Sequence, residues 1–525
     1  MQIISIISQE NISKNLELIR NDFYSEGYEL RLDLIFKIIS NKSVIKIQEI
    51  LNKIKIKNKI VIITLRDKNQ GGEYLGSFEE KLEIYNQIAK DNEDYNNLYF
   101  DFEYYINKEI LEQFINKNPE NKIIYSYHNF TLTPKSSDLH GILKAIICKN
   151  INKKKIIYKI VSKARNSLDS LELIAFLQNA KSKDSELNII THCMGRDGEF
   201  SRIINGIYGS EFTYGFLNQE QEFLNKNIGC ISTEDLNNIY QINKLNKSTK
   251  IYALLGDPVS HSIGHIFHNK YFSNLNLNSI YLKINLLENE LDEFFKKIKA
   301  FNFYGLSITM PLKESVFKYI SNKEDFKLIN AINTIKIKNN NVLVGRNTDG
   351  LGAYLALNHL KNLCENNNFK FLFIGSGGAV EGIINELISK LIKCNILILN
   401  RTLKNAEKIK SKFKQICLNY NSTISVISFE ELSNNNNFFE KNIKNQDLFV
   451  INAISNSNIK DNIKDNINIK SLFNKIFNAI SNKSIVMDIN YYNDILDLIP
   501  NNIKAINGNI MFHEQARLQQ EFWSN

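Results

Sequence analysis

The sequence contains few cysteines and no long apolar run. Its 6 cysteines among 525 residues are scattered and include no Cys-x-x-Cys pair, which excludes a disulfide scaffold and gives no support to a zinc knuckle or a dithiol redox motif. No segment reaches the roughly 18 uninterrupted apolar residues of a membrane-spanning helix. The apolar residues 1–7 have no basic region and no small-residue cleavage site, so we expect a buried strand there instead of a signal peptide. These absences favour a soluble, cytoplasmic protein without a membrane partner.

The sequence also lacks a dense basic stripe, although its net charge is +9 from 65 Lys+Arg and 56 Asp+Glu. The lysines are dispersed among asparagines and isoleucines, without interleaved aromatic residues. We therefore expect no nucleic-acid partner, and small anionic ligands are the better interpretation of the positive surplus. The oligomeric state is left open by the sequence.

Residues 1–240 alternate short apolar runs with amphipathic stretches. Eight strands separated by helices predict an α/β fold of the (β/α)₈ TIM-barrel type, in which chemistry takes place at the carboxyl ends of the strands. We expect these strands at residues 1–8, 30–33, 60–65, 98–103, 122–127, 156–161, 188–191 and 206–212. The polar residues that follow or interrupt these runs include Glu29, Arg31, Arg66, His128 and Lys159.

A polar stretch at residues 243–249 ends this pattern and marks the expected domain boundary. We expect a barrel domain at residues 1–240, an α/β lobe at 249–349 and a third domain at 350–507. A C-terminal helix within 508–525 should pack back on the α/β lobe. In the third domain a strand, a glycine turn, a helix and another strand follow in order, which is the arrangement of a doubly wound, Rossmann-like nucleotide-binding domain.

Lys159 lies within an apolar strand of the expected barrel. A lysine in such a place is costly unless its charge is paired or its pKa has fallen, and a depressed pKa makes the amine a nucleophile toward ketones. A strand-end lysine that reaches water is an equal alternative. His128, at the end of the preceding strand, is the candidate proton carrier because imidazole titrates near neutrality, although a single histidine is more often structural.

Short motifs of the first half resemble, in order and spacing, the type I 3-dehydroquinate dehydratases. They are Glu29-Leu30-Arg31-Leu32-Asp33, Thr64-Leu65-Arg66 with Gly71-Gly72-Glu73, Ser126-Tyr127-His128, Lys159, and Met194-Gly195-x-x-Gly198-x-x-Ser201-Arg202. The resemblance covers about residues 1–235. It implies that Lys159 forms an imine with the ketone of 3-dehydroquinate, and that His128 removes the adjacent proton and then protonates the leaving hydroxyl. It also implies that Arg202 binds the substrate carboxylate and that no metal takes part. The residues implied to position the ring hydroxyls are Glu29, Arg31 and Arg66.

Two departures from that family concern groups that assist catalysis. Gln70 stands where the family has a glutamate before its glycine pair, which removes a carboxylate expected to orient and tune His128. Residues 226–230, Lys-Asn-Ile-Gly-Cys, replace the family's Ser-Ala-Pro-Gly-Gln stretch, which puts two substrate contacts and the closure of the last loop in question. A slow dehydratase, or another loop that substitutes, follows as an open alternative.

The glycine turn of the third domain carries the second candidate site. It consists of Gly375, Ser376, Gly377, Gly378 and Ala379, with Val380 where the general dinucleotide fingerprint has Gly or Ala. About 25 residues after the turn begins, the next strand ends at Asn400, Arg401 and Thr402, with an arginine where an acidic residue would bind a free ribose 2′-hydroxyl. Arg401, with Lys404 close by, can pair with a 2′-phosphate, which predicts NADP as the cofactor. A solvated surface arginine is the alternative.

Lys313 and Asp349 are the candidate acid–base pair of this site. Hydride delivery to a ketone requires a donor to the developing alkoxide, and a lysine held by a carboxylate supplies both the proton and electrostatic stabilisation. Each residue alone is common on protein surfaces, so the interpretation depends on the motifs that surround the two.

Those motifs resemble shikimate dehydrogenase across residues 250–525. They are Gly256-Asp257-Pro258-Val259-Ser260-His261-Ser262, His268-Asn269, Gly305-Leu306-Ser307-Ile308-Thr309, Asn330-Ala331-Ile332-Asn333-Thr334, Asp488-x-x-Tyr491 and Gly508-x-x-Met511-x-x-x-Gln515-Ala516. The resemblance implies that Lys313 and Asp349 carry catalysis, and that Gly508 and residues 452–455 lie beside the cofactor. The residues implied to hold the carboxylate and hydroxyls of shikimate are Ser262, Thr309, Asn333, Tyr491 and Gln515.

Gly264 departs from this family because it replaces the second serine of a Ser-x-Ser motif. The loss of one hydroxyl should weaken shikimate binding by about 1–3 kcal/mol if its partner is left unsatisfied, and it leaves quinate open as a secondary substrate. His261, His265 and His268 near the same turn could suggest a metal site. We expect none, because no carboxylate or cysteine lies nearby in sequence and the resemblance gives the segment a substrate-binding role.

Together the two halves predict a bifunctional enzyme of the shikimate pathway. It would dehydrate 3-dehydroquinate to 3-dehydroshikimate and reduce that ketone with NADPH to shikimate. One alternative is a dehydrogenase whose barrel has become inactive, which Gln70 and residues 226–230 keep open. The other is a non-enzymatic regulator that senses pathway metabolites, against which the retained catalytic pairs argue.

Overall fold

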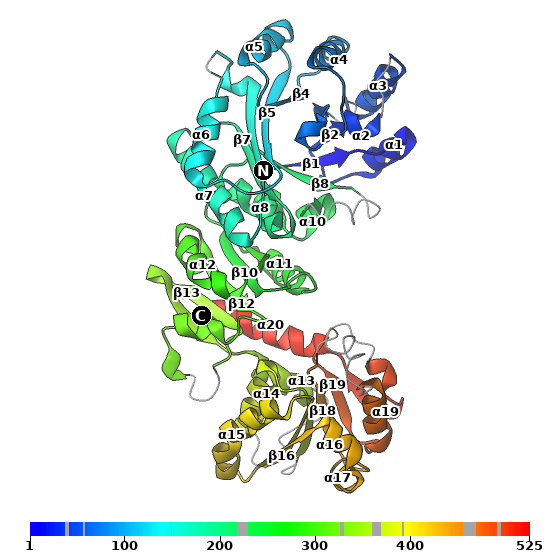
Figure 1. Ribbon diagram of the computed structural model, residues 1–525, viewed down its shortest axis with the longest axis vertical. Helices are drawn as coiled ribbons and strands as arrows, with labels where there is room; N and C mark the ends of the chain where they lie inside the picture. The colour runs from blue at the N-terminus through cyan, green and yellow to red at the C-terminus, as the bar shows by residue number, and fades with distance from the viewer. Residues whose placement is uncertain are drawn as a thin grey trace. The chain divides into compact units, whose positions relative to one another are not determined.

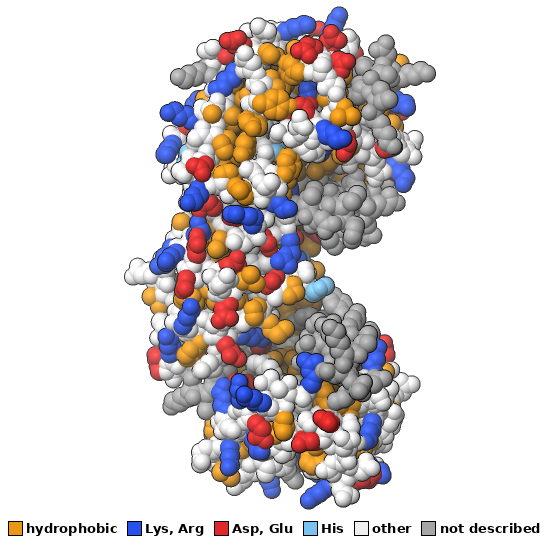
Figure 2. All heavy atoms as spheres, viewed as in Figure 1, with side chains coloured by type: hydrophobic (Ala, Val, Ile, Leu, Met, Phe, Trp, Pro, Cys, Tyr) orange, Lys and Arg blue, Asp and Glu red, His pale blue; other side chains and the backbone are white. Residues whose placement is uncertain are grey.

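The computed structural model describes residues 1–525 except 37–40, 56–57, 149, 218–228, 326–329, 360–368, 391–392, 455–468, 491–494 and 525. The chain divides into two compact units, Met1–Phe303 and Tyr304–Asn525. Among the described residues, no helix combines the length and the apolar character required to cross a membrane. Lys and Arg side chains are interspersed with Asp and Glu on the face shown in Figure 2, where no continuous basic stripe is visible.

The first unit is built on a parallel sheet that curls into a barrel (Figure 1). Its strands follow the order β7-β6-β5-β4-β3-β2-β1-β8-β9. Their bounds are β1 Gln2–Ile7, β2 Gly27–Arg31, β3 Ile60–Thr64, β4 Leu98–Glu103, β5 Lys122–Asn129, β6 Ile156–Lys163, β7 Ile189–Met194, β8 Phe212–Phe216 and β9 Ile231–Ser232. The ring closes where the Glu211 amide donates to the Ile189 carbonyl, at 2.9 Å, and so joins the starts of β7 and β8.

Helices follow the strands and cover the outside of the barrel (Figure 1). They are α1 Ile12–Asn21, α2 Leu32–Ile35, α3 Asn41–Lys55, α4 Phe78–Lys90, α5 Lys108–Lys117, α6 Ser136–Ile146, α7 Ser167–Lys183, α8 Glu199–Ile204 and α10 Thr233–Asn238. The predicted fold class is therefore confirmed for this half. The expected last strand, 206–212, was placed too early, because residues 205–208 form a 3₁₀ turn that Gly209 ends in a left-handed conformation with φ 101°.

Strand residues alternate between two cores, which decides what faces the inside of the barrel. Ile123 and Tyr125 of β5 pack outward in the large core that the helices share, while Ile124 packs inward. The same alternation holds on β6, where Tyr158 packs outward and Ile157 inward. The inner core consists of Ile4, Ile60, Ile62, Tyr99, Ile124, Ile157, Ile190, Phe212 and Tyr214. Because side chains two residues apart on a strand share a face, the residues that follow these apolar positions also face the interior.

The first unit continues with β10 (Lys250–Gly256) and β11 (Ser279–Asn285), which pair in parallel over seven residues. Helix α11 (Gly264–Asn274) lies between them in sequence, and α12 (Leu291–Lys297) follows β11. Lys297 forms an ion pair with Glu172 of α7. Tyr240, just after α10, stacks on His265 of α11 with ring centroids 5.9 Å apart. The first unit thus contains the barrel together with the start of the next predicted lobe.

The second unit has an antiparallel and a parallel part. Strands β12 (Phe303–Ile308), β13 (Thr334–Lys338) and β14 (Val342–Arg346) form antiparallel pairs. The parallel sheet has the order β17-β16-β15-β18-β19-β20, with bounds β15 Phe369–Ile374, β16 Cys394–Asn400, β17 Thr423–Ser428, β18 Phe449–Asn452, β19 Ile485–Asp488 and β20 Lys504–Ile506. In order of appearance this is 3-2-1-4-5-6, the strand order of a doubly wound dinucleotide-binding domain. The Rossmann-like prediction is confirmed.

Helices cover both faces of this parallel sheet (Figure 1). They are α13 Asp349–Asn358, α14 Gly378–Lys390, α15 Leu403–Asn419, α16 Phe429–Asn434, α17 Asn436–Asn442, α19 Ile469–Ala479 and α20 Gly508–Ser524. The C-terminal helix α20 packs against α13, and a Cβ at Gly352 would lie only 2.8 Å from Cβ of Gln515. The same helix reaches β13, where the Trp523 indole donates to the Ile335 carbonyl at 3.0 Å.

Candidate active sites

Lys159 occupies the middle of β6 and points into the barrel, since Ile157 on the same face belongs to the inner core. Its side chain is buried, and Nζ lies 3.4 Å from Asp101 Oδ2 and 3.6 Å from Glu29 Oε1. Nζ also lies 4.2 Å from the centre of the Tyr214 ring. The lysine therefore does not reach water at a strand end. Its charge is paired, which is one of the two conditions that the sequence left open.

Asp101 is the residue that joins the cations of this site, and sequence reasoning missed it. Arg66 Nη2 donates to Asp101 Oδ2 at 2.9 Å, and the Ser126 hydroxyl donates to Oδ1 at 2.6 Å. Burial would raise the pKa of Asp101, but the charges of Arg66 and Lys159 and the hydrogen bonds from Ser126 and Arg66 outweigh it and lower that pKa. The carboxylate is thus ionised and balances two buried cations.

Sequence reasoning also missed a second carboxylate of β4, Glu103. It accepts from Lys81 Nζ at 2.7 Å, and its Oε1 lies 3.7 Å from Arg66 Nη1. Lys81 itself is fully buried on α4 and also pairs with Asp67 at 2.7 Å. The available signal was the alternation Asp-Phe-Glu at the end of an apolar strand, which places both carboxylates on the inner face.

His128 ends up on the same inner face, two residues after Ser126 on β5. Its ring stacks on Phe130 with centroids 5.8 Å apart, and its Nδ1 is shielded from solvent with no hydrogen-bond partner in the described part of the chain. Burial, followed by the charges of Arg66, Lys159 and Arg31, lowers the pKa of His128 well below its usual range. A neutral imidazole beside a lysine is able to accept a proton.

The other predicted barrel residues occupy different positions around this centre. Glu29 accepts from the Thr64 hydroxyl at 2.8 Å and faces Lys159. Arg31 makes a two-point contact with Asp33, at 2.9 and 2.7 Å. Arg202 is buried on α8, and its positive charge adds to the larger effect of burial in lowering the pKa of the inward-facing His192.

The two departures noted in the sequence lie partly within the described structure. Gln70 ends a short 3₁₀ turn, and its Oε1 is buried without a partner among the described residues. In the altered loop, residues 226–228 lie outside the described part. Cys230 is buried with its thiol 3.5 Å from the Tyr214 carbonyl, and Gly229 has φ 67° in close contact with the Gly195 carbonyl.

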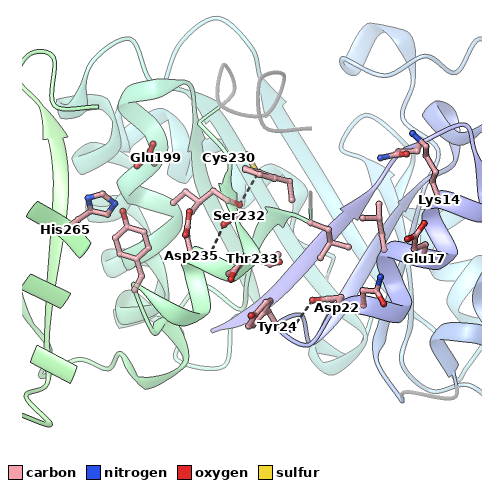
Figure 3. Close-up of a pocket in the computed structure, with 18 of the residues that line it drawn as sticks. Lys14, Glu17, Asp22, Tyr24, Glu199, Cys230, Ser232, Thr233, Asp235 and His265 are labelled. Atoms are coloured by element: carbon pink, nitrogen blue, oxygen red, sulfur yellow. Dashed lines mark hydrogen bonds between the residues drawn. The ribbon is translucent and has the colours of Figure 1, made fainter. Parts of the chain in front are cut away.

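A cavity of about 700 Å³ lies beside the barrel, between α1 and α10 (Figure 3). Its walls include Lys14, Glu17, Glu199, Asp235 and His265. None of the predicted catalytic residues lines it. Two of its lining residues, Leu217 and Cys230, flank in sequence the undescribed residues 218–228, so we assign no ligand to it.

In the second unit, Lys313 and Asp349 are in direct contact, with Nζ 2.6 Å from Oδ2. A turn places the lysine, because the Leu312 amide donates to the Thr309 carbonyl at 2.9 Å and the Ile332 amide donates to the Lys313 carbonyl at 2.8 Å. Asp349 is the first residue of α13, where the helix dipole stabilises a negative charge. The pair has the geometry that proton transfer from a lysine requires.

Asn333 holds the aspartate from the other side. Its amide nitrogen lies 2.7 Å from Asp349 Oδ1, 2.9 Å from the Thr348 hydroxyl and 3.1 Å from Gln515 Oε1. Gln519, which was not predicted, supports this group by donating to the Asn333 carbonyl at 3.3 Å while accepting from the Ser307 hydroxyl at 2.9 Å. The side chain of Asn333 thus contacts both Gln515 and the carboxylate of Asp349.

Two of the residues predicted to contact the substrate, Ser262 and Tyr491, are not among the described contacts of Asn333 and Asp349. Ser262 belongs to the first unit, where its hydroxyl accepts from the Gly264 amide at 3.1 Å. Tyr491 lies outside the described residues. The neighbouring histidines have packing roles: the His268 ring stacks on Tyr281 at 4.3 Å, and burial together with the charge of Lys283 lowers the pKa of His265 to about 3. Within the described ranges, no cluster of His, Cys, Asp and Glu is arranged to hold a metal.

The glycine turn lies at the carboxyl edge of the parallel sheet. Gly375 follows β15 with φ 115°, a conformation that favours glycine, and its amide donates to the Leu399 carbonyl of β16 at 2.9 Å. Helix α14 begins at Gly378, so its amino end points to the turn. Arg401 and Lys404 are exposed just beyond β16, where the Asn400 side chain donates to the Thr402 carbonyl at 2.9 Å. Gly508 lies tightly against the Ile489 carbonyl. This edge fits a dinucleotide phosphate on a helix amino terminus with two cations nearby.

Comparison with known proteins matches two different families along the chain. A model of the type I 3-dehydroquinase family matches residues 4–247, and a model of the shikimate dehydrogenase substrate binding domain matches residues 254–335. The protein named shikimate biosynthesis protein AroDE of Chlamydia pneumoniae is 32% identical over 309 residues, which are 59% of this chain and 60% of that protein. The chloroplastic bifunctional 3-dehydroquinate dehydratase/shikimate dehydrogenase of Arabidopsis thaliana is 29% identical over 337 residues, 63% of this chain and 53% of that protein.

These two matches span less than two thirds of the relatives' own length. The shikimate dehydrogenase (NADP(+)) of Methanococcus maripaludis is 35% identical over 197 residues, which are 36% of this chain and 69% of that protein. The chain therefore belongs to the shikimate dehydrogenase family, and its residues 4–247 match the model of the type I 3-dehydroquinase family.

Proposed function

We propose that this chain catalyses two consecutive reactions, the dehydration of 3-dehydroquinate and the NADPH-dependent reduction of 3-dehydroshikimate to shikimate. The arrangement that carries the proposal is the presence of two lysines with buried carboxylate partners, Lys159 beside Asp101 and Lys313 beside Asp349. The ketone released by the first reaction is the acceptor of the second. The two family matches and the names of the relatives support both activities.

In the dehydratase, the Lys159 nitrogen attacks the substrate ketone, and the ketone oxygen leaves as water to give a positively charged imine. His128 removes the proton from the neighbouring carbon, since its lowered pKa keeps the imidazole neutral. The same imidazolium then protonates the departing ring hydroxyl, and water releases the product from Lys159. Arg202 binds the carboxylate, while Glu29, Arg31 and Arg66 contact the ring hydroxyls.

In the dehydrogenase, NADPH supplies the hydride when it is bound. Lys313 donates a proton to the alkoxide that develops on the substrate, and Asp349 holds the ammonium in place at 2.6 Å. Asn333 and Gln515, which contact each other, position the substrate hydroxyls together with Ser262, Thr309 and Tyr491. The turn from Gly375 to Ala379, with Gly508, receives the dinucleotide, and Arg401 and Lys404 pair with the 2′-phosphate.

We further propose the domain division 1–240, 249–349 with 508–525, and 350–507, and a cytoplasmic location. The five described cysteines are buried free thiols, which suits a reducing compartment. The partners proposed are small-molecule substrates, without nucleic acid.

A coupled assay tests both activities together. The full chain supplied with 3-dehydroquinate and NADPH should consume NADPH and release shikimate. Borohydride added with 3-dehydroquinate should attach the substrate to Lys159, and the adduct should be absent from Lys159→Ala but present in Lys163→Ala, an exposed lysine of the same strand. A folded chain that forms no adduct yet reduces 3-dehydroshikimate would be a dehydrogenase with an inactive barrel.

A second pair of variants tests the dehydrogenase activity. Lys313→Ala should abolish NADPH-dependent reduction and leave the dehydratase intact, whereas Lys338→Ala, at the exposed end of β13, should leave both rates unchanged. Unchanged reduction by Lys313→Ala would refute the assignment. A chain that binds the metabolites and catalyses neither reaction would be a regulator.

A further inference from the structure

Strand β7 places a second imidazole inside the barrel. His192 is 5% exposed and shares the inner face with Ile190, a member of the inner core. It is aligned with Val161 of β6, which is aligned in turn with His128 of β5. Lys159 lies two residues before Val161 on the same face. The strand that carries the lysine is therefore flanked on both sides by a histidine at the same height.

Tyr214 of β8 connects this imidazole to the lysine. The His192 and Tyr214 ring centroids are 5.6 Å apart with an interplanar angle of 52°, and Lys159 Nζ lies 4.2 Å from the centre of the same tyrosine ring. Imidazole, phenol and ammonium thus form one cluster on the wall made by β6, β7 and β8. His128 approaches the lysine from the opposite neighbour, β5.

Two atoms of this cluster are shielded from solvent without a hydrogen bond. His192 Nδ1 and the Tyr214 hydroxyl have no partner anywhere in the described part of the chain. Leaving a buried polar group unsatisfied is unfavourable, and a histidine kept only for packing would normally bond a carbonyl or a carboxylate. Unsatisfied groups grouped around Lys159 are accounted for by a polar ligand bound to that lysine.

Burial and the surrounding charges determine the protonation state of His192. Burial, and then the positive charges of Arg202 and Lys159 and the neighbouring His128, lower its pKa well below the usual range. The imidazole is therefore neutral, with one nitrogen that donates and one that accepts. Such an imidazole can accept a proton from one atom and donate a proton to another, and it is neutral again afterwards.

We propose that His192 is a second catalytic imidazole of the dehydratase, which touches the substrate on the β7 side of Lys159 and carries protons while the imine forms. This inference rests on the function proposed above. As the carbon–nitrogen bond forms, the ammonium of Lys159 gives up two protons, one at a time, through His192 to the ketone oxygen. The carbon–oxygen bond breaks, that oxygen leaves as water, and one proton stays on the positively charged imine. Hydrolysis runs through the same steps in reverse.

The proposal divides the work between the two imidazoles. His128 removes the carbon-bound proton and protonates the departing ring hydroxyl. His192 transfers protons to the ketone oxygen that leaves as water when Lys159 forms the imine. The division fits the positions of the two strands, since β5 and β7 adjoin opposite edges of β6.

The test is the rate at which borohydride traps 3-dehydroquinate on Lys159 of the full chain. His192→Gln keeps most of the side-chain volume and the ability to form hydrogen bonds, but it cannot carry a proton. We expect trapping and dehydratase kcat to fall at least tenfold, with a smaller change in KM. Ile190→Val removes volume from the same face of the same strand and should stay within twofold of the unsubstituted chain.

Each contrary outcome has a separate meaning. Trapping and kcat within twofold of the unsubstituted chain in both His192→Gln and His192→Ala would overturn the role of His192, as would equal slowing by Ile190→Val. Far-UV circular dichroism and the urea midpoint establish that the barrel is folded in each variant. Failure of the unsubstituted chain itself to form an adduct would instead refute the proposed dehydratase.

Discussion

Asp101→Asn should destabilise the first unit by about 3 kcal/mol, because it removes a negative charge from between two buried cations. Asp101 is 1% exposed, and its Oδ2 lies 2.9 Å from Arg66 Nη2 and 3.4 Å from Lys159 Nζ. Asparagine keeps the shape of the side chain, and its carbonyl can still accept from the Ser126 hydroxyl. The charge is therefore the property that changes.

The magnitude follows from what remains around the two cations. Removing one partner of a buried ion pair costs about 3–5 kcal/mol. Glu29 is still 3.6 Å from Lys159, and Glu103 is still 3.7 Å from Arg66, so the lower end of that range applies. With an m-value of about 3 kcal/mol per molar urea for a unit of this size, the urea midpoint should fall by about 1 M.

The single tryptophan of the chain makes the assay specific. Trp523 lies in the second unit, so its fluorescence follows that unit, while far-UV circular dichroism reports on both. Asp101→Asn should move the circular dichroism transition of the first unit to lower urea and leave the tryptophan transition in place. The matched control is Asp91→Asn, an exposed position after α4 with an expected change below about 0.5 kcal/mol. Equal midpoints for the two variants would refute the reasoning.

Three further predictions concern the second site and pH. Asn333→Ala should lower reduction about 100-fold, as measured by NADPH consumption, because Asp349 loses its 2.7 Å contact; a change below twofold would contradict this. Arg401→Ser should raise KM for NADPH at least tenfold with little effect on NADH, and equal shifts for both would exclude contact with the 2′-phosphate. His265, with a pKa of about 3 when folded and about 6.5 when unfolded, stabilises the chain above pH 6.5. That contribution falls by about 2 kcal/mol on lowering the pH to 5, so His265→Phe should flatten the pH dependence of the urea midpoint.

The sequence predicted the site best where a chemically reactive residue also occupies an inward-facing position in the alternating pattern of a strand. Lys159 and His128 lie at the strand positions that alternation assigns to the barrel interior, and Lys313 meets Asp349 as the hydride-transfer argument required. The Rossmann-like domain was also predicted correctly from the glycine turn and the strands and helix around it. These features depend on local pattern, which a single sequence contains.

The residues that were missed depend on contacts between distant segments. Asp101 and Glu103 look like ordinary strand residues until β4 is placed beside β3, β5 and β6. His192 is separated by 64 positions from His128 in sequence, and only the register of three strands shows that they flank one lysine. Gln519 acts through Asn333, 186 residues away. No periodicity in the sequence carries such information.

The two lysines differ in burial in a way that fits their proposed chemistry. At Lys159 the positive charge persists, since the ammonium is replaced by a positively charged imine. Fixed carboxylates can therefore stabilise both the ammonium and the imine without reorganisation, and the Lys159 and Asp101 side chains are 5% and 0% exposed. At Lys313 the charge is lost when the alkoxide takes its proton, which would leave Asp349 as an unpaired buried anion. That site needs access to water or a proton source to restore the ammonium, and the Lys313 and Asp349 side chains are correspondingly 19% and 8% exposed.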